Sequence, residues 1–245
     1  MNRKTIITIA TITLGIGVTL AGWFIGNGIA AVKSNERFVT VKGLAERQVE
    51  ADRAVWAITY IAASNMLGEA KAKLEAEQNA VQAFLEQYKI EKADTELQRF
   101  RVIDQLARTY SSERVANRYL LQQTTLVRTD NIKAVASAAQ NIGDLIDAGV
   151  IFGTLDGYDH NAGPHYLFTK LNDIKPRMIA LATKNARTAA DQFVENSGTT
   201  ISGIRRARQG QFQILPAESA PNLREETQIH KKVRLVTTLQ YVISH

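Results

Sequence analysis

The sequence has 245 residues, of which 45% are hydrophobic and 22% charged, and its formal net charge is +6. It contains no Cys, which excludes disulfides, thiolate nucleophiles and Cys-ligated metals. The positive excess is mild and both signs are interspersed, so the composition does not indicate a nucleic-acid-binding protein.

An uncharged and mostly apolar run covers residues 5–32 and follows Arg3 and Lys4. A helix needs about 20 residues to cross the hydrocarbon core of a bilayer, so this run is long enough. The apolar core of a cleaved signal peptide usually has only about 7–15 residues, which favours an uncleaved anchor. Gly28-Ile29-Ala30 has the small residues of a cleavage site and leaves cleavage open. We expect a cytoplasmic tail at 1–4, a transmembrane anchor in contact with lipid at 5–32, and an outer domain at 33–245.

The first half of the outer chain is typical of two strands, a helix and two further strands. Apolar alternation predicts strands from 38 to about 50 and over 54–61, joined as a hairpin by the short step Ala51-Asp52-Arg53. Apolar residues at helical spacing predict a helix over 66–88 that packs one face on a sheet. Two more strands are expected over 95–109 and 118–128.

A helix from about 131 to 147 leads into a second half with the same order of elements. The sequence predicts its elements in this order: strands at 150–158 and 165–171, a helix at 176–195, and strands at 200–213 and 233–243. Alanines give the second helix a small-residue face suited to close packing.

These elements predict an α+β fold: a mostly antiparallel sheet with helices packed on it, in two ββαββ-like halves joined by a helix. One N-terminal transmembrane helix is expected to precede the two halves. The periodicity of Trp56, Tyr60 and Phe84 places these aromatic residues in the core and not in a ligand pocket.

Several short motifs recur together in this chain. They are Val41-Lys42-Gly43 with Ala51-Asp52-Arg53-Ala54, the step from Ile90 to Leu97, the alanine-rich stretch around Asn185-Ala186-Arg187, and Gly198 with Ile201-Ser202-Gly203-Ile204. With the closing strand at 233–243, this combination resembles the SIMPL-domain family over about residues 38–243. The chain departs from the family at Ile90 and Ser202, where glycine is common, which affects local turns.

The resemblance implies an α+β domain of the bacterial envelope with no agreed activity. It implies a signal peptide or an anchor and a tendency to form homo-oligomers. With the apolar run at 5–32, we expect an anchor in the bacterial inner membrane and an outer domain in the periplasm. It also suggests a role in the envelope or oxidative stress response together with an unknown protein partner. Because the chain has no Cys, direct thiol peroxidase chemistry is excluded.

No assembled catalytic motif is present, neither a G-x-S-x-G elbow nor a glycine-rich phosphate loop. Asp159, His160 and His165 lie close together in sequence and carry side chains that bind metals, as a metal-assisted hydrolase would require. Their spacing across a Gly-Pro turn is not a standard ligand spacing, so we expect a solvated loop there.

Arg205, Arg206 and Arg208 fall on one predicted strand and offer charge-assisted contacts to lipid phosphates or other polyanions. The alternative, which we favour, is a charged strand edge that discourages sheet-to-sheet aggregation.

We therefore expect a membrane-anchored, self-associating scaffold or interaction protein that is not an enzyme. No catalytic residue, cofactor, metal or nucleic-acid partner is expected. The alternatives are a lipid- or polyanion-binding module that uses Arg205, Arg206 and Arg208, or a metal-assisted hydrolase around Asp159, His160 and His165.

Overall fold

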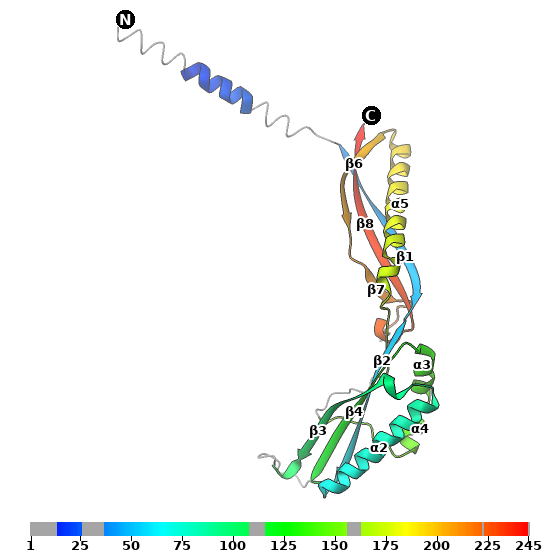
Figure 1. The fold of residues 1–245 in the computed structure, drawn as a ribbon. Helices are drawn as coiled ribbons and strands as arrows, with labels where there is room; N and C mark the ends of the chain where they lie inside the picture. The colour runs from blue at the N-terminus through cyan, green and yellow to red at the C-terminus, as the bar shows by residue number, and fades with distance from the viewer. Residues whose placement is uncertain (1–13, 26–36, 108–115, 156–162, 222, 245) are drawn as a thin grey trace, which may run out of the picture. The chain divides into compact units, whose positions relative to one another are not determined.

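A computed structural model describes residues 14–25, 37–107, 116–155, 163–221 and 223–244 of the chain (Figure 1). The described part contains two four-stranded sheets with antiparallel strand pairs and several helices, which confirms the predicted α+β class. The chain divides into two compact units. Unit 1 consists of Met1–Lys42, Ala186–Arg208 and Thr238–His245, and unit 2 of Gly43–Asn185 and Gln209–Thr237.

The elements follow one another along the chain in this order: β1 (Phe38–Glu50), β2 (Arg53–Ser64), α2 (Leu67–Gln87), η1 (Lys92–Asp94), β3 (Thr95–Asp104), η2 (Gln105–Ala107), β4 (Tyr119–Thr129), α3 (Ile132–Gln140), α4 (Gly143–Asp147), β5 (His165–Leu167), α5 (Leu171–Ser197), β6 (Thr200–Gln209), β7 (Gln213–Pro216), η3 (Glu225–Thr227) and β8 (His230–Ser244).

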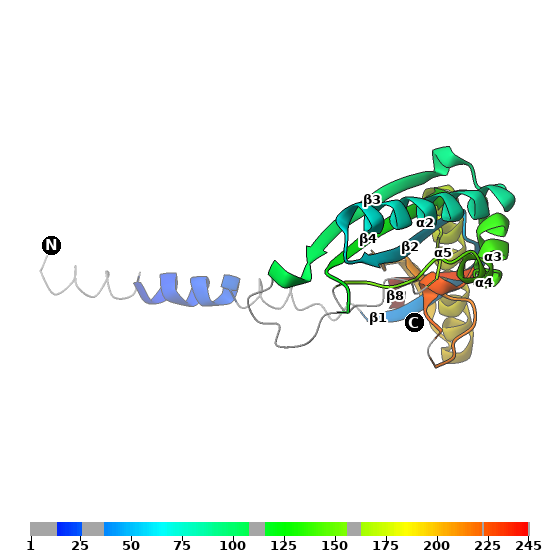
Figure 2. The same ribbon diagram turned by 90° about the horizontal axis from the view of Figure 1, so that it is seen from below.

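One sheet lies wholly within unit 2 and has the strand order β3-β4-β2-β5. Its central strands, β2 and β4, pair antiparallel from Ala54 opposite Thr129 to Ser64 opposite Tyr119. Helix α2 runs along one face of this sheet (Figures 1 and 2). As the sequence predicts, Trp56, Tyr60 and Phe84 are buried in the core between the sheet and the helix.

The predicted hairpin between residues 38–50 and 54–61 is wrong, because β1 and β2 belong to different sheets. At the step between them, Ala51 N donates to Ile229 O and Asp52 N donates to Leu167 O, each at 2.8 Å. A tight hairpin favours Gly or Asn at the positions that need φ > 0, and Ala51-Asp52-Arg53 offers neither. The step therefore carries the chain from one sheet to the other.

The second sheet contains β1, β8 and β6 in that order, with β7 also paired to β8. Helix α5 packs on it through small residues. In unit 2, Ala182 and Met178 meet Ala45, Val233 and Leu235, whereas in unit 1 Ala186 and Ala190 meet Val41, Leu239 and Tyr241. The predicted small-residue face of this helix is thus the buried one, because alanine lets a helix approach a sheet closely.

Several predicted boundaries differ from the observed ones. The helix expected over 131–147 is divided into α3 and α4, and α5 begins at Leu171, which places Pro176 inside the helix. The strand expected over 200–213 is interrupted at Gly210, whose N–H donates to Val236 O at 2.9 Å. A Cβ at Gly210 would lie 2.5 Å from the same oxygen, so the close approach requires glycine.

The strand expected over 150–158 is reduced to one bridge, between Phe152 and Tyr60, and residues 156–158 lie outside the described ranges. Ile61 N donates to Ile151 O at 2.9 Å and Gly153 N to Thr59 O at 3.3 Å, so this segment still follows the edge of β2.

Residues 14–25 form a helix, and most of the predicted anchor at 5–32, like the tail at 1–4, lies outside the described residues. Within the part of the chain that is described, none of the helices combines the length and hydrophobicity needed to cross a bilayer.

Candidate functional site

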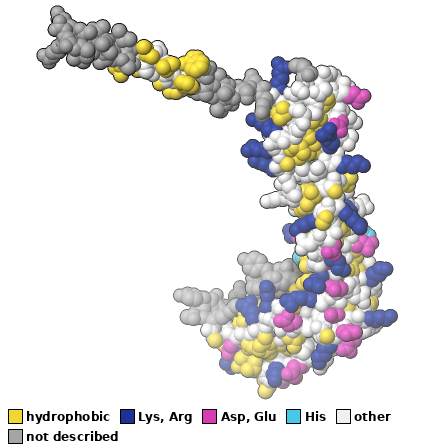
Figure 3. All heavy atoms as spheres, turned by 45° about the horizontal axis from the view of Figure 1, so that its top comes forward, with side chains coloured by type: hydrophobic (Ala, Val, Ile, Leu, Met, Phe, Trp, Pro, Cys, Tyr) yellow, Lys and Arg dark blue, Asp and Glu magenta, His cyan; other side chains and the backbone are white. Residues whose placement is uncertain are grey.

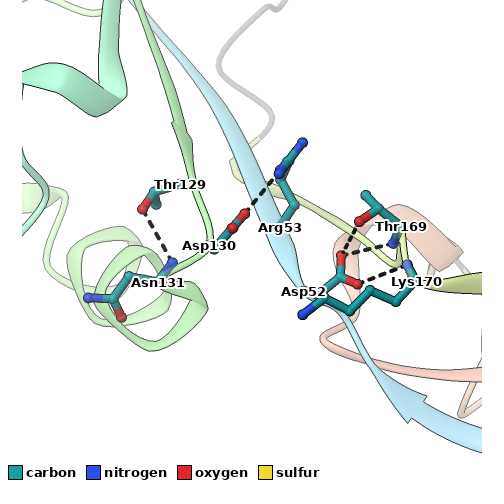
Figure 4. A network of polar contacts seen from close by, with 7 residues as sticks. All are labelled: Asp52, Arg53, Thr129, Asp130, Asn131, Thr169 and Lys170. Carbon is teal, nitrogen blue, oxygen red and sulfur yellow. Dashed lines mark hydrogen bonds and ion pairs between the residues drawn. The ribbon is translucent and has the colours of Figure 1, made fainter. Parts of the chain in front are cut away.

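Asp52, in the step between β1 and β2, binds the residues just before α5 (Figure 4). Its Oδ1 accepts hydrogen bonds from Thr169 N at 2.8 Å and Thr169 Oγ1 at 2.9 Å, and its Oδ2 accepts from Lys170 N at 3.0 Å. Burial raises the pKa of Asp52, but these hydrogen bonds and the charge of Lys170 outweigh it and keep the pKa below its ordinary value. One carboxylate thus positions the start of α5 beside the step between the sheets.

Replacing Asp52 with asparagine is expected to accelerate amide hydrogen exchange at Thr169 and Lys170 about tenfold, because charge-assisted bonds become neutral ones or are lost. The matched control is Asp130→Asn, which should leave both amides protected. Folding lowers the pKa of Asp52. The carboxylate therefore stabilises the folded chain at pH values above 3.8, its pKa in the unfolded chain, and this stabilisation is lost as the pH falls through the folded pKa. Unchanged exchange in Asp52→Asn would show that the carboxylate does not hold this segment.

Asp130 belongs to a second polar group beside this step, also drawn in Figure 4. Arg53 Nε lies 3.0 Å from Asp130 Oδ1, with 48% and 72% of the two side chains exposed, so this ion pair contributes little stability. Asn131 N donates to Thr129 Oγ1 at 3.2 Å, and Asn131 Oδ1 caps α3 by accepting from Ala134 N at 3.2 Å. These bonds fix the turn between β4 and α3.

A hollow of about 590 Å³ lies in unit 2 between α3, β5 and the segment that joins β7 to β8. Its walls are mainly apolar, with a few polar groups, and consist of Ala136, Ala139, Gln140, Pro164, Tyr166, Ala217, Glu218, Leu223, Thr227, Gln228, Ile229 and His230. A second hollow, of about 460 Å³, shares Ile229 and His230 and reaches Asp130 and Asn131. The size and lining of the larger hollow suit a small, mostly apolar molecule.

The segment at 217–229 forms one wall of this hollow and is held in place by side-chain hydrogen bonds. Gln228 Nε2 donates to Glu218 O at 2.8 Å, and Glu218 N donates to Gln228 Oε1 at 3.2 Å. Lys231 on β8 is fully buried, donates from Nζ to Glu225 O at 2.7 Å and forms an ion pair with the Glu225 carboxylate. The Gln228–Glu218 bonds thus close the segment on itself, and the contacts of Lys231 hold it to β8.

The titratable residues that line the larger hollow are Glu218, His230 and Tyr166. His230 Nδ1 lies 3.7 Å from Glu50 Oε1, and both side chains are about 70% exposed. Within the described ranges, no group of three or more His, Cys, Asp and Glu side chains is arranged to hold a metal ion. This arrangement can bind a ligand by shape and hydrogen bonding.

The two predicted sets of site residues differ in how far the structure describes them. Asp159 and His160 lie outside the described residues, and His165 is exposed on β5, opposite Val55 of β2. Arg205, Arg206 and Arg208 are exposed on β6 in unit 1, and the guanidinium of Arg205 lies 4.8 Å from the centre of the Phe38 ring. The hydrolase and polyanion alternatives thus stay predictions.

Sequence reasoning missed both the hollow and the Lys231–Glu225 pair. The sequence does contain a signal for Lys231. Alternate residues of this strand, Val233, Leu235 and Thr237, face the core, and Lys231 stands two positions before Val233 on the same face. A lysine at a core-facing position predicts a buried partner.

Most of the chain matches one known protein family. The family model described as SIMPL, protein of unknown function (DUF541), matches residues 39–237. A crystal structure of an uncharacterized conserved protein from Listeria innocua is similar at 12% identity, with 81% of this chain and 92% of that chain covered and a TM-score of 0.20. No curated protein matches the chain.

Proposed function

Because the chain belongs to the SIMPL family, whose function is unknown, we propose that it is a scaffold or interaction protein that self-associates and carries out no catalysis of its own. Residues 5–32 anchor it in the bacterial inner membrane, with residues 33–245 in the periplasm, where it serves the envelope or oxidative stress response. The apolar run supports the anchor, and the mainly apolar lining of the described hollow supports binding.

The observation that carries self-association is the surface of β3, an edge strand of the unit 2 sheet. Three large apolar side chains on this strand are about half exposed: Leu97 at 52%, Phe100 at 58% and Val102 at 46%. Soluble proteins rarely leave such groups clustered on an edge unless a partner covers them. In a symmetric pair, a second copy would cover this surface with the same three residues.

The geometry of β3 indicates how a partner binds. The register shifts between Gln98 and Arg101, and Arg99 has a φ of 51°, so a bulge interrupts the free edge of the strand. A bulged edge resists the addition of another strand. We therefore propose packing of apolar side chains between two copies and not a sheet continued from one copy into the next.

The double variant Phe100→Asp/Val102→Asp is expected to shift the full chain, purified in a mild detergent, from a discrete oligomer toward a monomer. Burying two unpaired carboxylates at an apolar contact costs several kcal/mol, enough to lower the affinity more than a hundredfold. Light scattering across a concentration series, corrected for bound detergent, measures the mass.

The matched control is Ile146→Asp/Ile151→Asp, which changes two apolar residues of unit 2 that are 61% and 58% exposed, away from β3. This control should keep the mass of the parent protein. A parent that stays monomeric throughout the series refutes self-association, and an equal loss in both double variants refutes the role of β3.

A further inference from the structure

The entire net charge of this chain resides in unit 1. Unit 1 contains nine Lys and Arg against three Asp and Glu, whereas unit 2 contains 21 against 21. The formal charge of +6 is thus +6 on the smaller unit and zero on the larger one. Arg3 and Lys4 precede the apolar run, so the part of unit 1 beyond the run carries seven Lys and Arg against three Asp and Glu, or +4. On the face drawn in Figure 3, Lys and Arg side chains prevail over Asp and Glu in unit 1, while both signs are interspersed over unit 2.

The basic side chains of unit 1 are displayed on an exposed strand. Every residue of β6 except Ile201 is exposed, and this strand carries Arg205, Arg206 and Arg208 within four positions. Among the residues that the structure describes, no carboxylate forms an ion pair with Arg206, Arg208 or Lys42, whereas Arg187 pairs with Asp191 at 2.9 Å. Within the described ranges, the positive charges of Arg206 and Arg208 are therefore not neutralised by a neighbouring carboxylate.

The apolar run belongs to unit 1 and leads directly into its first strand. β1 begins at Phe38, and only the five residues 33–37 separate it from the end of the run at Val32. Five extended residues span at most about 18 Å. If the run crosses the bilayer, β1 begins within this distance of the end of the run, so unit 1 lies within reach of the lipid headgroups.

We propose that unit 1 binds anionic phospholipid headgroups at the outer surface of the membrane, with Arg206 and Arg208 of β6 as principal contacts. Guanidinium groups form forked, charge-assisted hydrogen bonds to phosphate, and cations near an anionic surface gain affinity additively. This inference rests on the proposed anchoring by residues 5–32. It adds a lipid class to that proposal and assigns the contact to one unit.

The absence of Cys makes the test direct, because any introduced Cys is the sole labelling site. Gly203→Cys on β6 reports on unit 1, and Gly68→Cys on α2 reports on unit 2, since a Cβ at either position meets nothing within 4 Å. The full chain, with a fluorophore on the Cys, is reconstituted in vesicles of phosphatidylcholine with or without one third phosphatidylglycerol. A trace of lipid with a quencher on its headgroup measures contact.

We expect quenching at position 203, but not at 68, to rise when phosphatidylglycerol is present and to fall when salt is raised to about 0.5 M, where the Debye length is about 4 Å. Arg206→Glu/Arg208→Glu should lower the ratio of chains with unit 1 on the headgroups to chains with unit 1 free of them. We expect a decrease of at least about 25-fold, because each cation near an anionic surface raises this ratio about fivefold. The charge-matched control Lys71→Glu/Lys133→Glu, in unit 2, should leave it unchanged.

Flotation of the same samples at high salt separates this inference from the anchoring on which it rests. Chains that float at high salt without lipid-dependent quenching at 203 refute the headgroup contact and keep the anchor. Chains that float only at low salt and only with phosphatidylglycerol refute the anchor and keep the contact. Equal quenching in both lipids, or equal loss in both charge variants, overturns the inference.

Discussion

Replacing Glu225 with alanine is expected to destabilise unit 2 by about 3–5 kcal/mol, because it leaves a buried ammonium without its carboxylate. The side chain of Lys231 is completely buried, and that of Glu225 is 30% exposed. In the variant, the backbone carbonyl oxygen of residue 225 remains as the hydrogen-bond acceptor for Lys231 Nζ among the described residues. One neutral acceptor does not compensate a charge removed from water.

The opposite single substitution should behave differently. In Lys231→Met the apolar side chain occupies the same buried position, and the partly exposed Glu225 carboxylate can be hydrated, so the change in stability should stay within about 1 kcal/mol. The double variant Glu225→Ala/Lys231→Met should then recover most of the stability that Glu225→Ala loses. This asymmetry distinguishes a buried charge from general damage to the segment at 217–229.

The chain offers a clean probe for this measurement. It has two Trp residues, and Trp56 lies in the core of unit 2. In a Trp23→Phe background, the emission of Trp56 reports the urea unfolding of that core, and the shift in midpoint gives the change in free energy. Equal losses in Glu225→Ala and Lys231→Met, with no recovery in the double variant, would contradict the buried-charge explanation.

The order of elements and the core aromatics could be predicted because their signals are local. The alternation of Trp56, Ile58 and Tyr60 is visible in one short window, and their burial between β2 and α2 follows from it. Strand pairing is not local. β1 pairs with β8, at the far end of the chain, and no pattern within residues 38–64 distinguishes that partner from the adjacent β2.

The candidate site could not be predicted for the same reason. Asp52 appears in the sequence only as part of a short step between strands, but its carboxylate binds residues more than a hundred positions later, at Thr169 and Lys170. Nothing near Asp52 in sequence indicates those partners. The hollow is likewise lined by three segments, from α3, β5 and residues 217–230, that only the fold brings together.

Glu77→Gln is expected to make unit 2 more stable by about 3 kcal/mol at pH 8 and to remove most of its pH dependence between pH 5 and 8. Glu77 lies on the buried face of α2 with 9% of its surface exposed, and its Oε2 has no hydrogen-bond partner among the described residues. Burial raises the pKa of Glu77 to about 7. The fold therefore holds a carboxyl that prefers its neutral form.

The sign follows from proton binding in the two states. Between the unfolded pKa of 4.5 and the folded pKa of about 7, the folded chain holds a proton that the unfolded chain has released. Stability is then greatest below pH 4.5, decreases as the pH rises through this range, and stays reduced above it. A shift of about 2.5 pKa units corresponds to about 3 kcal/mol.

Tyr60 gives a second reason to expect this behaviour. Burial raises the pKa of Tyr60, its hydrogen bond to Thr125 opposes that rise, and the charge of Glu77 raises the pKa further. The ionised carboxylate at position 77 thus acts on the centre of the core. Urea unfolding of Glu77→Gln, followed by Trp56 emission at pH 5 and pH 8, measures the effect.

The control is Glu75→Gln on the same helix, where the carboxylate is exposed and pairs with Lys71 at 3.3 Å. An exposed pair of this kind contributes at most about 0.5 kcal/mol, so this variant should keep the parent's pH dependence. If Glu77→Gln instead loses stability equally at pH 5 and pH 8, the carboxylate is satisfied in the fold by a partner outside the described residues or by water. A stabilisation confined to pH 8 would show that the core of unit 2 retains an ionisable group at a cost in stability.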